Sequence, residues 1–293
     1  MSIESLVFQL MNAVVWAWVL ALLSLGLTLI FGYLDIVNVA HGVLYATGAV
    51  VLWWLVQLTG SPGWGFMLAL VAAPLIVAAI GFAAFTVTIR PIASRPPIFT
   101  LVTTFGLMFV LQHALFMIFG GAPRSVEMPI ATLIPMLGRT YPLYRFAMAG
   151  IAAAIIMGLW WFLHRSNYGT WIRAVQQNRD VATAMGIPAR QVATVVFCLG
   201  SALAGIAGVL AAPVLQVRYD MGVDIIMDAF MVVIAAGFGN LPGTVLVALI
   251  YQIIQAVFVM VMTPIQAKVI ALSVVLTTVL LRRKVLLARE RLK

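Results

Sequence analysis

The residues of this sequence with clear chemical potential are a few acidic side chains set in apolar surroundings. Asp220, Asp224 and Asp228 recur every four residues, so on one helix their carboxylates would lie on the same face. The helix dipole stabilises a carboxylate near a helix N-terminus, which accounts for Asp224. Asp228 would lie one turn deeper, where an unpaired charge costs about 3 kcal/mol or more in a bilayer. We therefore expect Asp228 to face protein or water, and it is the candidate for binding a coupling ion.

Other residues of catalytic type do not form a catalytic or metal-binding set. The three histidines at 41, 113 and 164 lie far apart, without the spacing of metal ligands. Cys198 is the single cysteine and lies inside an apolar run, which excludes an internal disulfide. No nucleophile is paired with a base, and the nucleotide-binding pattern G-x-x-x-x-G-K-[ST] is missing. We therefore expect no catalytic residue, no metal, no cofactor and no ATP hydrolysis by this chain alone.

The composition predicts a membrane protein. Of the 293 residues, 64% are hydrophobic and only 9% are charged, and the mean hydropathy is +1.14. A soluble domain would carry about 25% charged residues. The net charge is +9, but the basic residues lie at the ends of apolar runs, which argues against a nucleic-acid surface. We predict an all-α, polytopic helical bundle that forms a single transmembrane domain over residues 1–293.

Apolar runs of about 20 residues, the length that crosses a bilayer as a helix, predict where the membrane segments lie. They cover approximately 6–31, 36–57, 64–89, 97–120, 144–164, 192–215, 225–262 and 265–281. The run 225–262 is too long for one helix and is interrupted by glycine and proline at 237–243, so we expect eight or nine segments. Glycine or alanine at 200, 204 and 208 favours close helix packing, as a static contact or as a moving gate.

Lysine and arginine predict the orientation of the chain. If the loop at about 165–191 is cytoplasmic, the inside segments hold twelve basic residues and the outside segments hold five, which satisfies the positive-inside rule. The twelve are Arg90, Arg95, Arg165, Arg173, Arg179, Arg190, Arg282, Arg283, Lys284, Arg289, Arg291 and Lys293. The five are Arg124, Arg139, Arg145, Arg218 and Lys268. The N-terminus would then lie outside and the C-terminal tail inside.

The loop at about 165–191 is the longest stretch that is too polar for lipid. Its local signals predict two short helices, the first over roughly 169–177. Asn178 or Asp180 would cap the second, because a short side-chain oxygen satisfies free backbone N–H groups. Gly186 suits the left-handed residue after a helix, and Pro188 prevents its continuation. A compact helical knob of this kind suits docking of another protein, although an ordinary amphipathic loop would read similarly.

Asp180-Val181-Ala182, followed after three residues by Gly186, resembles the E-A-A-x-x-x-G loop of ABC importer permeases. In that family the loop is the coupling helix, which enters a groove on a cytoplasmic ATPase. Asp and Val replace the Glu and the first Ala, and the later Ile-x-Leu-Pro part of the motif is absent. The flanking residues are similar to those of the branched-chain amino acid permeases, the LivH/LivM class. The resemblance implies an ATPase-coupling role for Arg173, Ala174, Asn178, Asp180, Ala182 and Gly186.

Two further blocks carry the resemblance. Residues 26–32 match the G-L-x-L-I-F-G run of that class, residues 38–42 are similar to its N-F-A-H-G segment, and the stretch 229–243 ends in Gly-x-Gly-x-x-Pro-Gly. Asp35, Asn38 and His41 are three apart and would share one helix face, with His41 bonded to a backbone carbonyl rather than to substrate. Two interruptions of the apolar helices, a first at 38–42 and a second at 237–243, line the path or are packing kinks at the cytoplasmic rim. The path candidates are Asn38, His41, Gly42, Gly237, Gly239, Pro242 and Gly243.

The longest outside loop, 120–145, would in this family receive an extracytoplasmic binding protein, or it is a simple connector. Its candidate docking residues are Arg139 and Arg145, together with Arg218 from a later loop.

The resemblance implies a permease subunit that imports branched-chain or related amino acids across a bacterial inner membrane. It implies a second homologous permease, two cytoplasmic ATPases that bind the ATP, and a substrate-binding protein. Urea, short amides and small carboxylates are alternative substrates, since related systems share these motifs. A secondary transporter is the alternative mechanism, and an intramembrane enzyme is disfavoured by the lack of a catalytic pairing.

Overall fold

The computed structural model describes residues 3–93, 95–136 and 139–290, and from residue 278 onward it describes the backbone alone. The basic side chains of the tail predicted to lie inside therefore fall outside the described residues. In the described part, helices joined by loops make up the regular structure apart from one two-stranded sheet, which confirms the all-α class. Its elements are α1 (Ile3–Leu34), α2 (His41–Thr59), α3 (Pro62–Ala84), a π-helical turn (Phe85–Ile89), a 3-10 turn (Arg90–Ile92), α4 (Pro97–Phe119), β1 (Leu133–Met136), β2 (Arg139–Pro142), α5 (Leu143–Arg165), α6 (Asn167–Gln177), α7 (Arg179–Ala184), α8 (Ala189–Ala211), α9 (Met221–Ala236), α10 (Leu241–Val259) and α11 (Pro264–Glu290).

Seven helical stretches within the described residues are long and apolar enough to cross a bilayer: 4–34, 41–59, 62–92, 97–119, 143–165, 189–211 and 241–259. Two shorter helices, α9 and the apolar part of α11 at 264–277, occupy the other two predicted places. The chain is therefore a multi-pass membrane protein, and the expected count of eight or nine segments is approximate.

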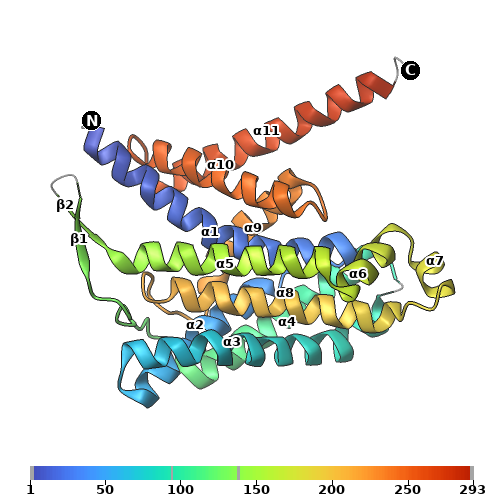
Figure 1. Cartoon of the computed structure of the whole chain (residues 1–293), viewed down its shortest axis with the longest axis horizontal. Coiled ribbons are helices and arrows are strands. Elements are labelled where there is room, and N and C mark those ends of the chain that lie inside the picture. Colours follow the sequence, from blue (N-terminus) through green and yellow to red (C-terminus); the bar gives the residue numbers. More distant parts are fainter. Residues whose placement is uncertain (1–2, 94, 137–138, 291–293) are drawn as a thin grey trace.

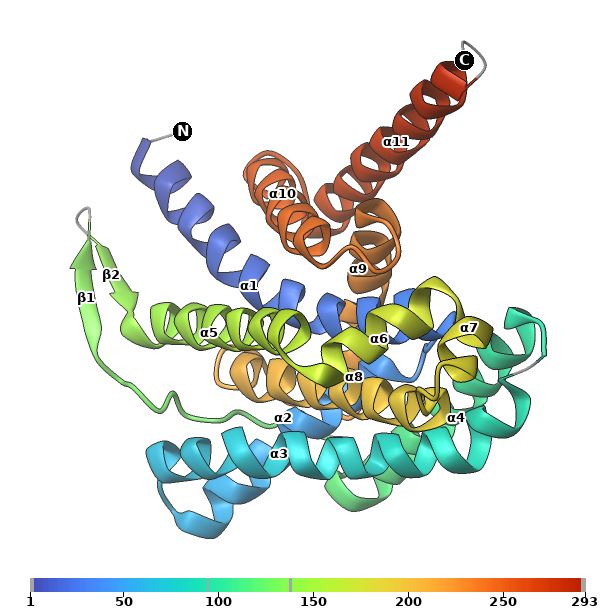
Figure 2. The ribbon, with the colours of Figure 1, turned by 45° about the vertical axis from the view of Figure 1, so that its right-hand side comes forward.

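The long helices lie side by side and give the molecule two distinct ends (Figure 1). One end, the hairpin end, carries the antiparallel pair β1–β2 and the start of α1. The opposite end, the knob end, carries α6 and α7, which together form the α6–α7 knob (167–184). α1 packs against α8 and α10, while α2 lies inside the bundle against α3, α8 and α9. α11 packs on α10 near its start and then projects away from the bundle (Figure 2).

Glycines let the central helices touch backbone to backbone. A Cβ atom added to Gly208 of α8 would lie 1.9 Å from the Tyr45 carbonyl oxygen of α2, and one added to Gly48 of α2 would lie 2.0 Å from the Gly205 carbonyl oxygen. Gly200 is similarly close to Gly26 of α1. Such contacts leave no room for a side chain, so the small residues predicted in α8 serve close packing in this structure.

The first helix interruption differs from its prediction. Asp35 has a left-handed backbone (φ 55°), so α1 ends at Leu34 and residues 35–40 are not helical. Asp35, Asn38 and His41 therefore do not share a helix face, and the span expected from residue 36 begins at His41. Without helical hydrogen bonds, the buried backbone polar groups of this segment need other partners. Thr104 of α4 supplies two of them: its hydroxyl donates to the Val37 carbonyl oxygen (2.8 Å) and accepts from the Val39 N–H (3.3 Å).

The second interruption confirms the division of the run 225–262 into two helices. Gly237 and Gly239 both have positive φ angles, 88° and 76°, which end α9 at Ala236. Asn240 then caps α10, because its Oδ1 accepts from the Gly243 N–H at 3.0 Å. Pro242 lies in the first turn of α10, where its missing N–H leaves no bond unmade.

Candidate functional site

The α6–α7 knob has the two short helices that the sequence predicts. The Ser166 hydroxyl caps α6 by accepting from the Gly169 N–H at 2.9 Å. Of the two predicted caps for α7, the structure uses Asn178, whose Oδ1 accepts from the N–H groups of Asp180 (3.1 Å) and Val181 (3.0 Å). Gly186 has the predicted left-handed conformation (φ 84°) and ends the knob.

The residues expected to contact an ATPase divide into internal and exposed groups. Arg173 is half-buried, and its guanidinium donates to the Leu163 carbonyl oxygen, so it holds α6 against the end of α5. Ala174 is half-buried. Ala182 is buried and belongs to the apolar core, so it anchors α7. Asn178, Asp180 and Gly186 are exposed.

Two apolar side chains that the motif comparison did not single out stand out on the tip of the knob. Val181 is 54% exposed and Met185 is 79% exposed. They are four residues apart and therefore lie on one face of α7 and its C-terminal turn. Together they give the polar tip a small apolar surface that a partner protein could cover. Their spacing of four residues could have indicated a shared helix face from the sequence. Only the structure shows that Ala182 is buried and that Val181 and Met185 are exposed.

Through Gln176 the knob contacts the last turn of α1 and the second interruption. Its Nε2 donates to the Gly32 carbonyl oxygen near the end of α1 at 3.2 Å. Gly32 packs directly on Gly239: a Cβ atom on Gly32 would lie 2.2 Å from the Gly239 nitrogen. The rings of Phe31 and Phe238 meet edge to face beside this contact, with centroids 4.2 Å apart. Gln176 of α6 therefore lies against both α1 and the α9–α10 junction.

The path candidates of the first interruption are buried inside the helix bundle. Asn38 is fully buried, and neither polar atom of its amide has a hydrogen-bond partner among the described residues. His41 is also buried, and its Nε2 bonds the Leu23 carbonyl oxygen at 3.1 Å, which confirms the expected backbone contact. Gly42 packs on Gly222 of α9, where a Cβ atom would lie 2.5 Å from the Gly222 carbonyl oxygen.

The path candidates of the second interruption lie at the knob end and are less buried. Pro242 is exposed, while Gly237, Gly239 and Gly243 are half-buried. Beside them is a polar groove of about 590 Å³ between the end of α1, the knob and the start of α8. The two sets of candidates thus lie at different depths, and the structure joins their segments through the contact of Gly32 with Gly239.

Two of the three candidate docking arginines lie together at the hairpin end. Arg139 and Arg145 line a cavity of about 410 Å³ with Asn12 of α1 and Tyr141 of β2. The Arg145 guanidinium and the Tyr141 hydroxyl both donate to Asn12 Oδ1, the latter at 2.9 Å. Burial raises the pKa of Tyr141, so its hydroxyl stays protonated and remains a donor.

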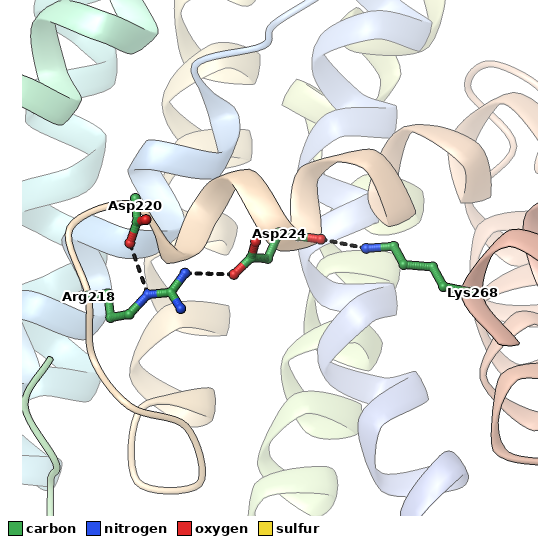
Figure 3. Close-up of polar contacts among 4 residues, drawn as sticks. All are labelled: Arg218, Asp220, Asp224 and Lys268. Carbon is green, nitrogen blue, oxygen red and sulfur yellow. Dashed lines mark hydrogen bonds and ion pairs between the residues drawn. The ribbon is translucent and has the colours of Figure 1, made fainter. Parts of the chain in front are cut away.

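The third, Arg218, lies apart from them and is paired within the chain (Figure 3). Its Nε contacts Asp220 Oδ1 at 2.9 Å, and its Nη2 contacts Asp224 Oδ2 at 2.8 Å. The hydrogen bond to Asp220 raises the pKa of Arg218 above its ordinary value. Arg218 thus fixes the loop before α9 to the first turn of that helix.

Asp228 is expected from the sequence to face protein or water, and in the structure it is bonded to neighbouring helices while it also lines a cavity. Its Oδ1 accepts from the Tyr251 hydroxyl of α10 at 2.7 Å and lies 3.1 Å from Lys268 Nζ of α11. The same Nζ donates to the Asp224 carbonyl oxygen at 2.8 Å (Figure 3). Lys268, which the sequence analysis counted only for orientation, therefore connects α11 to α9. Nothing in the local sequence pairs residues forty positions apart.

Comparison with known proteins gives a consistent result. The family described as branched-chain amino acid transport system / permease component matches residues 9–281. The chain is 27% identical to the high-affinity branched-chain amino acid transport system permease protein BraD of Pseudomonas aeruginosa, over 85% of this chain and 84% of the relative. It is 26% identical to the permease protein LivH of Escherichia coli K12, over 85% and 84%. A probable LivH of Methanocaldococcus jannaschii is 25% identical over 92% and 89%.

The family match spans nearly the whole described bundle, from the first turns of α1 to α11, and includes both interruptions and the knob between them. The chain therefore belongs to the family of branched-chain amino acid transport system permease components.

Proposed function

We propose that this chain is the membrane permease subunit of an ATP-driven importer for branched-chain or related amino acids. The names of its relatives support the substrate class. The ATP is bound and hydrolysed by two partner ATPase subunits on the cytoplasmic side, and this chain has no catalytic role. A second permease, homologous or identical, completes the path, and an extracytoplasmic binding protein delivers the amino acid. The membrane is the bacterial inner membrane, with the N-terminus outside and the C-terminus inside.

The observation that carries this proposal is the contact of the α6–α7 knob with the end of α1 and with the α9–α10 junction. The knob presents Val181 and Met185 to a partner, while Gln176 on its inner side contacts Gly32 and the Gly239 backbone. A partner that moves the knob thereby moves the ends of α1, α9 and α10. This is the arrangement that ATP-driven opening of a passage requires.

The docking surface is tested with the double variant Val181→Arg, Met185→Arg. Both side chains are exposed, so the substitutions leave the packing of the knob intact and place two charges on an apolar contact. We expect the ATPase to be lost on co-purification of the assembled transporter, together with ATP-driven leucine uptake. Val261→Arg at the hairpin end, also highly exposed, is the matched control and should retain the ATPase. Retention of the ATPase by the double variant would refute docking at the knob.

A further inference from the structure

A cavity near the first turns of α9 lies apart from the α6–α7 knob and from the hairpin cavity of Arg139 and Arg145, and Arg218 is the one candidate docking residue that lines it. Its volume is about 520 Å³, within the range of about 300–1,000 Å³ typical of small-molecule sites. Its walls come from α1, α2, the loop before α9, and α9 and α10. Gln255 lines it one turn from the end of α10 at Val259, and Trp16 lines it one turn beyond Asn12 on α1. The cavity therefore lies in the half of the bundle that faces the hairpin end.

Groups of both charges border this cavity and have binding capacity left. Arg218 uses Nε and Nη2 for Asp220 and Asp224, and its Nη1 has no partner among the described residues. The Asp224 side chain is 72% exposed, and Arg218 contacts only its Oδ2. A positive and a negative group held 2.8 Å apart can meet the two charged ends of one small ligand.

An unsatisfied hydroxyl points independently to a ligand. Tyr45 of α2 lines the cavity and is only 1% exposed, and its hydroxyl has no hydrogen-bond partner among the described residues. It lies within electrostatic range of the Asp224 carboxylate. Buried hydroxyls almost always have a partner, so an incoming polar group is the simplest way to satisfy this one. Gln252 and Gln255 add two amides from one face of α10.

The wall also has an apolar part that suits an aliphatic side chain, formed by Trp16, Leu215, Met221 and Ile225. Gln216 and Asp228 line the cavity as well, and the Asp228 carboxylate is already paired with Lys268. We propose that this cavity is the outer receiving site of the permease and that it binds a zwitterionic amino acid with an aliphatic side chain. The α-carboxylate contacts Arg218 and the Tyr45 hydroxyl, the α-ammonium contacts Asp224, and the side chain lies against the apolar wall. This inference rests on the proposed function, because it assigns a site to the same substrate class.

The test is protection of a cysteine placed in the cavity. Gln255→Cys is introduced into a Cys198→Ser background, and the assembled transporter is reconstituted in vesicles and labelled with a small water-soluble thiol reagent. We expect leucine to slow labelling. 4-Methylpentanoate, which lacks the ammonium, and 3-methylbutylamine, which lacks the carboxylate, should each need an at least tenfold higher concentration, which corresponds to about 1.4 kcal/mol. Ile265→Cys, exposed on α11, is the control and should label equally with and without leucine.

A conservative substitution tests the hydroxyl. Tyr45→Phe keeps the ring and its packing, so the concentration of leucine that gives half-maximal protection should rise about tenfold, the effect of losing a hydrogen bond to a charged group. Tyr219→Phe is the matched control. The Tyr219 ring packs on Phe116 outside the cavity, so loss of the Tyr219 hydroxyl should leave protection by leucine unchanged.

Leucine uptake driven by ATP is measured in the same vesicles. Uptake without protection at Gln255→Cys would overturn the receiving site and leave the proposed function standing. Equal protection by leucine and by either analogue would overturn the zwitterion assignment. Protection by leucine alone, weakened in Tyr45→Phe, supports the site even if uptake fails, and the failure then falls on the proposed function.

Discussion

The contact between Gln176 and Gly32 predicts that coupling can be weakened without unfolding the chain. Gln176→Leu keeps the size of the side chain and removes the Nε2 donor that reaches the Gly32 carbonyl oxygen at 3.2 Å. One neutral hydrogen bond contributes about 1 kcal/mol net, and this one is partly exposed, so the loss is at most that size. The equilibrium between the state in which Gln176 is bonded to Gly32 and the state in which this bond is broken should then shift by at most about fivefold.

The assay compares amino acids transported with ATP hydrolysed in reconstituted vesicles. We expect Gln176→Leu to lower this ratio several-fold while ATP hydrolysis continues, because the ATPase still docks on the exposed tip. Gln177→Leu is the matched control: Gln177 is adjacent and exposed, and it lines the same groove without a described hydrogen bond. An unchanged ratio in Gln176→Leu, or an equal fall in the control, would refute transmission through this contact.

Three further predictions concern the other parts of the molecule. Neutralising Arg139 and Arg145 together should weaken stimulation of ATP hydrolysis by the loaded binding protein, and the effect should shrink with salt, since exposed pairs are screened beyond about 10 Å at 0.1 M; full stimulation at low salt would remove both from the interface. Lys268→Met leaves the Asp228 carboxylate without its cation and should lower the free energy of unfolding by about 1–3 kcal/mol. This loss is smaller than for a fully buried pair because the Lys268 side chain is 31% exposed, and a second change, Asp228→Leu, should restore the stability. An unchanged melting temperature would count against the pair. A cysteine at position 2 in a Cys198→Ser background should react with a membrane-impermeant reagent from outside, and reaction only with a permeant reagent would overturn the predicted orientation.

The sequence by itself determined the class and the linear plan of this protein. Its shortage of charge leaves a membrane bundle as the only way to bury so much apolar surface. Local chemistry fixed several boundaries because it acts over a few residues: a cap at Asn178 or Asp180 begins α7, Gly186 ends the knob, and the glycines at 237 and 239 divide the apolar run 225–262. These features depend on backbone sterics and capping, which operate between near neighbours.

Only the tertiary structure decided which of these features act together. The left-handed backbone of Asp35 removed the helix face that a spacing of three had predicted for Asn38 and His41. The packing of Gly32 on Gly239 and the pairing of Lys268 with Asp228 join segments far apart in the chain. Periodicity carries no information about such contacts, because they depend on how whole helices approach each other, and that approach is set by the small residues at every crossing at once.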